Sequence, residues 1–182
     1  DENALLLTST QIGAKANILE AMEGGILALQ LYYDNGRDFN GEQYLQQNVV
    51  VGKNSYSFNL EDLSGITRLR LDPINQPAKV KLLSAYAKLD NDENYSLELV
   101  WHNADLYESE VFDFKHDDPQ VVFNIPEDIQ ARLVSVEFVV DITPYNKWEI
   151  LALLSQVRNK LHAKDLNHSN CHVLLADITE QL

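Results

Sequence analysis

Cysteine is almost absent from this chain of 182 residues, since Cys171 is the only one. An intramolecular disulfide is therefore excluded, and folding does not depend on an oxidising compartment. Long apolar runs are missing too: none approaches the ~18 residues that a membrane-spanning helix needs. The length suffices for one ordinary domain or two small ones.

Positive charge is scarce as well. Fourteen Lys and Arg stand against 28 Asp and Glu, which leaves a formal charge of −14. Nucleic acid and anionic membrane surfaces are both bound through basic side chains, so neither is an expected partner. Hydrophobic residues make up 45% of the chain, which is enough to predict a buried core rather than disorder.

Motifs that carry catalysis are also lacking. The sequence contains no G-x-S-x-G, P-loop, G-x-G-x-x-G or H-E-x-x-H motif. Nothing singles out two of its many acids as a glycosidase pair. We therefore predict a chain that is not an enzyme by itself.

Metal-binding patterns are incomplete. GRDFNGE resembles part of an EF-hand loop, but the first and twelfth positions would be Gly36, without a side-chain oxygen, and Gln47. The acidic stretch DNDEN (90–94) lacks the glycine of such a loop. The C-terminal stretch offers zinc-ligand types without a second pair at finger-like spacing: His162, His168, Cys171 and His172. No cofactor or metal site is predicted, although a structural calcium ion bound in another way stays open.

What is present is a β pattern. Short runs rich in Val, Ile, Leu, Tyr and Phe are bounded by Asn, Asp, Gly and Pro. In TRLRLD, leucines 69 and 71 alternate with arginines 68 and 70, and SYSFNL (55–60) alternates in the same way. About ten such strands predict a mostly β protein, an antiparallel sandwich of the jelly-roll kind spanning residues 1–142.

Several stretches of the chain recur in the same order. LQLYYDNGRDFN (29–40) matches LELVWHNADLYE (97–108), and AKANILEAM (14–22) matches AKVKLLSAY (78–86). Further on, SYSFNL (55–60) matches QVVFNI (120–125), and ITRLRLD (66–72) matches VEFVVD (136–141). We therefore predict a sandwich built from two related halves, units of about 14–72 and 78–141. Because a ~60-residue unit rarely stands alone, the two are expected to share a core or to pack tightly together.

In the C-terminal part, the spacing of the apolar residues changes from that of a strand to that of a helix. Thr143 is a candidate N-cap and Pro144 a first helical residue, which predicts a helix over 143–164. An apolar stripe follows at helical spacing: Ile150, Leu154, Val157 and Leu161. This stripe is a candidate surface for homo-oligomerisation. Residues 165–182 are interpreted as a linker or the start of a further domain.

Two stretches carry a resemblance to a known family. QLYYDNGRDFNGEQ fits an aromatic–aromatic–Asp–x–Gly–x–x–Phe pattern, and ITRLRLDPINQPAKVKL contains Leu–Arg–Leu–Asp–Pro, with Ala78 where a glycine is usual. This pattern resembles a non-catalytic β-sandwich module, similar to carbohydrate-binding modules, of bacterial glycosyltransferases that build O-antigen, rhamnan and other surface polysaccharides. The likeness covers 29–89 well and 97–141 only loosely.

The resemblance implies an accessory module that binds a polysaccharide or oligosaccharide or positions flanking glycosyltransferase domains. It also implies a cytoplasmic location at the inner face of the membrane. The alternative is a purely structural module for interdomain packing or oligomerisation, without a ligand.

Sugar recognition uses exposed aromatic rings flanked by polar side chains. The candidate residues are Tyr33, Asp34, Asn35, Arg37, Phe39, Arg70, Trp101, His102, Asn103 and Tyr107. Against this, roughly half of the aromatics on alternating strands face the core. The sequence Asp34-Asn35-Gly36 is more typical of a turn. Arg68 and Arg70 are able to grip an anionic sugar, but pairing with neighbouring carboxylates is the favoured interpretation in so acidic a chain.

Overall fold

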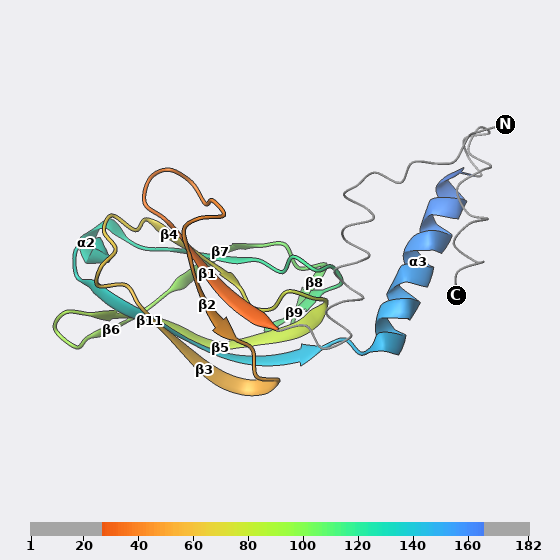
Figure 1. The fold of residues 1–182 in the computed structure, drawn as a ribbon, viewed down its shortest axis with the longest axis horizontal. Coiled ribbons are helices and arrows are strands. Elements are labelled where there is room, and N and C mark those ends of the chain that lie inside the picture. Colours follow the sequence, from red (N-terminus) through yellow and green to blue (C-terminus); the bar gives the residue numbers. More distant parts are fainter. Residues whose placement is uncertain (1–26, 166–182) are drawn as a thin grey trace. The chain divides into compact units, whose positions relative to one another are not determined.

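The computed structural model describes residues 27–165, which form eleven strands and two helices (Figure 1). All strand pairings among them are antiparallel. The five-stranded sheet has the order β2 (Tyr44–Asn48), β1 (Ala28–Asp34), β4 (Arg68–Asp72), β10 (Val121–Asn124) and β7 (Glu98–His102). The six-stranded sheet has the order β3 (Gly52–Asn59), β11 (Leu133–Pro144), β5 (Ala78–Leu89), β9 (Val111–Phe114) and β8 (Leu106–Glu108), and β6 (Asn94–Ser96) also pairs with β5. The predicted two-sheet antiparallel fold is confirmed.

The two sheets enclose one core. In β4, Leu69 and Leu71 are fully buried while Arg68 and Arg70, which alternate with them, are partly exposed, as the alternation predicts. Buried residues of both sheets belong to one cluster, among them Leu29, Leu31, Phe58, Leu69, Leu71, Phe112, Phe123, Val136 and Phe138. Residues of both predicted units thus contribute to the same cluster.

The predicted duplication gains little support from the strand order. The counterparts β1 and β7 lie in the same sheet, but β3 and β10 lie in different sheets, and so do β4 and β11. From β3 onward the chain crosses repeatedly from one sheet to the other, and among the described strands after β3 only β5 with β6 and β8 with β9 pair as consecutive strands. The earliest match, residues 14–22, lies outside the described residues.

The C-terminal helix begins later than predicted. Thr143 and Pro144 are still paired with β5, so neither starts the helix. Helix α3 (Lys147–Asp165) is capped by Asn146, whose side-chain oxygen accepts hydrogen bonds from the N–H groups of residues 148 and 149. The carboxylate of Glu149 accepts a hydrogen bond from the N–H of Asn146 at 2.7 Å, which completes a capping box. Asn146, two residues after Pro144, thus replaces Thr143 as the N-cap.

Other predictions for the C-terminal part concern residues outside the described part of the chain. The side chains of Val157 and Leu161, half of the predicted stripe, and residues 166–182 lie outside the described part. The same holds for the predicted histidine and cysteine ligand types at 162–172. The other helix, α2 (Glu127–Gln130), is a single turn between β10 and β11. Over residues 27–165, no helix is long and apolar enough to cross a membrane.

Contact between the sheets yields a stability prediction. The rings of Phe123 in β10 and Phe138 in β11 lie 5.5 Å apart, and both are fully buried. We expect Phe138→Ala to lower the free energy of unfolding by about 3–5 kcal/mol, because it leaves a cavity. The Phe123–Phe138 double-mutant cycle is expected to show a coupling of about 0.5–1.5 kcal/mol. Urea denaturation measures both.

The control for this prediction is Tyr86→Ala. Tyr86 lies in β5 and is 42% exposed, so its loss is expected to cost about 1 kcal/mol or less. Equal costs for Phe138→Ala and Tyr86→Ala would contradict a core centred between the two sheets.

Candidate functional site: a groove on the five-stranded sheet

The outward face of the five-stranded sheet carries a row of side chains that crosses all its strands. The strand register places Tyr44, Tyr32, Arg70, Val122 and Trp101 opposite one another from β2 to β7. Aromatic rings stand towards both ends of this row, and a guanidinium group lies in the middle. The row forms the base on which the candidate site is built.

An irregularity in β7 exposes two apolar residues side by side. Trp101 lies opposite Val122, but Leu99 lies opposite the next residue of β10, so Val100 is left without a partner. Such a bulge breaks the period-2 alternation. Trp101 is 50% exposed and Val100 43%, and both line the groove described below.

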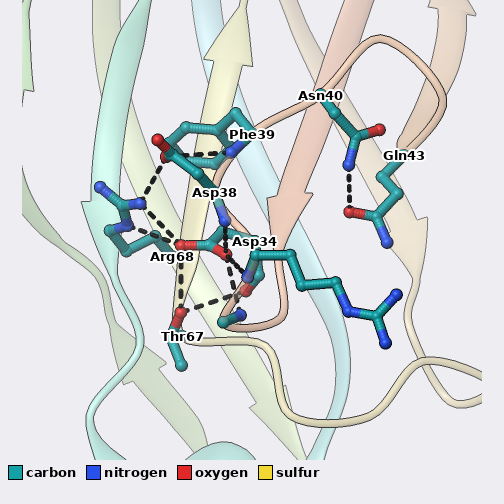
Figure 2. A network of polar contacts seen from close by, with 9 residues as sticks. Asp34, Asp38, Phe39, Asn40, Gln43, Thr67 and Arg68 are labelled. Atoms are coloured by element: carbon teal, nitrogen blue, oxygen red, sulfur yellow. Dashed lines mark hydrogen bonds and ion pairs between the residues drawn. The ribbon is translucent and has the colours of Figure 1, made fainter.

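The carboxylate of Asp34 organises the loop between β1 and β2. Its Oδ1 atom accepts three backbone hydrogen bonds, from Gly36 at 2.8 Å, Arg37 at 3.0 Å and Asp38 at 2.9 Å (Figure 2). Its Oδ2 atom accepts a bond from Nε of Arg68 at 2.9 Å. Asp34 is only 3% exposed. The predicted turn at 34–36 is thus confirmed, with Gly36 at a positive φ of 91° that glycine adopts without strain.

Opposing influences act on the pKa of Asp34. Burial by itself favours the neutral carboxyl, but the hydrogen bonds from Arg68 and from the backbone favour the charged form. The net result is a pKa below the ordinary value. The carboxylate therefore stays charged and continues to hold the loop.

The loop brings Phe39 over the two arginines of β4. The guanidinium carbon of Arg68 lies 4.9 Å from the centre of the Phe39 ring, and that of Arg70 lies 5.6 Å from it. Arg68 also reaches Asp38 at 2.7 Å. These contacts fix the ring above the sheet through cation–π attraction and ion pairing.

Arg70 is held from its other side. Its guanidinium carbon lies 4.1 Å from the centre of the Tyr32 ring. Its Nε and Nη2 atoms donate to the two carboxylate oxygens of Asp72 at 2.9 and 2.8 Å. Both arginines thus pair with carboxylates of their own chain, as the favoured interpretation of the sequence expected.

These elements enclose an open groove of about 390 Å³. Its lining residues are Phe39, Arg68, Arg70, Val100, Trp101, Gln120, Val122 and Asn124. Phe39 lies against the arginines of β4, and Trp101 belongs to β7, with β10 between these two strands. The groove therefore combines two aromatic rings with amide and guanidinium groups, which is the composition of a site for a small polar ligand with apolar faces.

Three predicted residues line the groove: Phe39, Arg70 and Trp101. Asp34 lies behind it as the anchor of the loop. Asn35 and Arg37 are exposed on the same loop but do not line the groove.

Tyr33 requires a correction. Because β1 alternates, its ring packs against the core beside Leu31, and the outward ring is that of Tyr32. The alternation in LQLYYD is the signal that identifies Tyr32.

Three further predicted residues also lie elsewhere. The ring of His102 is 5.1 Å from the core residue Phe112. Asn103 bonds the backbone of Asp118 at 2.7 Å and closes a loop. Tyr107 lies in β8 of the six-stranded sheet and stacks on Phe112 at 4.5 Å. None of the three lines the groove.

The described residues contain part of the incomplete metal-binding patterns of the sequence. Between residues 27 and 165 no group of three His, Cys, Asp or Glu side chains is arranged to hold a metal ion. Asp38 of the EF-hand-like stretch pairs instead with Arg68.

Comparison of the chain with models of protein families, with curated protein sequences and with solved structures finds no match.

Asp72 makes the folding stability of the protein depend on pH. Burial raises the pKa of its carboxyl to about 7, although Arg70 and its hydrogen bonds favour the charged form. The folded state therefore binds a proton that the unfolded chain, with an ordinary carboxyl pKa, releases near pH 4. The contribution of Asp72 to stability is full below about pH 4 and is lost as the pH rises through about 7.

We expect the free energy of unfolding of the wild type, relative to Asp72→Asn, to fall between pH 5 and pH 8. Chemical denaturation at several pH values measures this difference. A difference that stays constant or rises with pH would contradict the assignment to Asp72.

Proposed function

We propose that this chain is an accessory, non-catalytic β-sandwich module that binds glycan in the groove between Phe39 and Trp101. We further propose that it belongs to a bacterial glycosyltransferase that builds cell-surface polysaccharide. The observation that carries the first proposal is the pair of aromatic rings on either side of a polar floor. The second rests on the resemblance of residues 29–89 to modules of such enzymes.

The chemistry of the groove suits a sugar. A pyranose ring presents an apolar C–H face that stacks on an aromatic ring, and hydroxyl groups around its edge. Trp101 is half exposed, so it offers its ring without displacing other side chains. The amide of Asn124, which is exposed and makes no hydrogen bond within the described part of the chain, supplies a donor and an acceptor for hydroxyls.

The groove is also preformed. Phe39 is fixed by Arg68, and Arg68 by Asp34, so binding does not have to order the loop first. This lowers the entropic cost of association. Affinity is nevertheless expected to be weak, because the groove is open and offers few stacking surfaces.

In the parent protein, the module is proposed to hold the growing glycan, or to position the flanking catalytic domains, at the cytoplasmic face of the inner membrane. The competing function is a structural module without a ligand. The full-length gene tests the attachment, because transferase domains are expected on one or both sides of this segment.

Glycan binding yields a mutational prediction. We expect Trp101→Ala to weaken binding of an oligosaccharide, selected on a glycan array, by about fivefold or more, since the loss of a stacking ring removes about 1 kcal/mol or more. NMR titration of the labelled protein measures the affinity. The matched control is Tyr107→Ala, because Tyr107 is 46% exposed but lies outside the groove.

Equal losses in the two variants would place the binding site elsewhere. If no glycan shifts any resonance of the wild type, the binding proposal fails and the structural alternative stands.

A further inference from the structure

Both arginines of the groove are already neutralised by the protein. Arg68 contacts Asp34 and Asp38, each at 2.7 Å. Arg70 contacts Asp72 at 2.8 Å, and only 19% of its side chain is exposed. Above about pH 7, where Asp72 is ionised, three carboxylates thus face two guanidinium groups, so the floor offers no uncompensated positive charge.

An acidic sugar meets two penalties at such a site. Its carboxylate or phosphate has to displace Asp34 or Asp72 from a guanidinium group, or else lie beside these carboxylates and be repelled by them. Displacement is costly because Asp34 and Asp72 are only 3% and 8% exposed, and each buried carboxylate would lose its guanidinium partner. The formal charge of −14 adds a repulsive field around the whole chain.

A neutral sugar meets neither penalty. The groove's apolar parts come from Phe39, Val100, Trp101 and Val122, and its free amide from Asn124. Three lining residues alternate along β10 and the position just before it: Gln120, Val122 and Asn124. They therefore lie on one face of the strand and give the floor a length of roughly 14 Å. A volume near the lower end of the range for small-molecule sites suits a short segment of glycan.

We infer that the groove selects neutral glycan segments, aligned along β10, over segments that carry a uronic acid or a phosphate. The inference rests on the proposed function and specifies its ligand class. The arginines act as supports for the Phe39 and Tyr32 rings rather than as anion receptors.

The experiment compares two panels of trisaccharides at pH 8, where Asp72 is ionised. One panel consists of neutral hexoses, deoxyhexoses and N-acetylhexosamines, and in the other one residue of each compound is replaced by a uronic acid. We expect the best neutral compound to bind at least about tenfold more tightly than its acidic counterpart, with shifts centred on Trp101 and Asn124. Equal or tighter binding of the acidic panel would overturn the inference and leave glycan binding intact. No binding of either panel would overturn the proposed function itself.

A charge variant tests the cause of the selectivity. Asp38→Asn removes one carboxylate from Arg68 and keeps the oxygen that accepts its hydrogen bond. Asn also tolerates the positive φ of 66° at this position. We expect the ratio of acidic to neutral affinity to rise several-fold in this variant.

The matched control is Asp92→Asn. Asp92 has a φ of 63° and pairs with Lys88 at 2.8 Å in the turn between β5 and β6, outside the groove. Both variants change the net charge by the same amount. An equal rise in the ratio of acidic to neutral affinity would therefore mean that the net charge of the protein causes the selectivity. That outcome would overturn the assignment to the paired arginines.

Discussion

The Asp34 carboxylate is the interaction on which the groove depends. One of its oxygens holds three backbone N–H groups of the β1–β2 loop, and the other holds Arg68 of the neighbouring strand (Figure 2). Arg68 in turn supports the ring of Phe39. A buried charge is stable only when its hydrogen-bonding capacity is filled, and here the filling partners are the residues that shape one wall of the groove. Folding of the loop and formation of the site are therefore one event.

Much of the fold follows from the period of the sequence. The alternation in TRLRLD and SYSFNL assigns the buried faces of β4 and β3, because side chains on a strand point to opposite sides in turn. The spatial order of the strands does not follow from this pattern, since the partners of a strand come from distant parts of the chain. The matches between SYSFNL and QVVFNI illustrate the limit: both form strands, yet in different sheets. Similar strands resemble one another because burial selects similar residues.

The site was harder to predict than the fold. Phe39, Arg70 and Trp101 have the residue types of a sugar site, and they do converge. Residue type alone predicts Tyr33, although the alternation of β1 favours Tyr32 as the outward ring. The contribution of Val100 depends on a bulge, which leaves no clear signal in a single sequence. His102 and Tyr107 have suitable side chains, but both rings pack on Phe112. His102 is the last residue of β7, and Tyr107 lies in β8 at the edge of the other sheet.

Amide hydrogen exchange in the β1–β2 loop tests the central role of Asp34 most directly. The account predicts that the N–H groups of Gly36, Arg37 and Asp38 exchange much more slowly than free loop amides in the wild type, although all three residues are exposed. In Asp34→Ala this protection is expected to vanish, together with the fixed position of the Phe39 ring. Exchange of the three wild-type amides at the rate of an unstructured peptide would contradict the account.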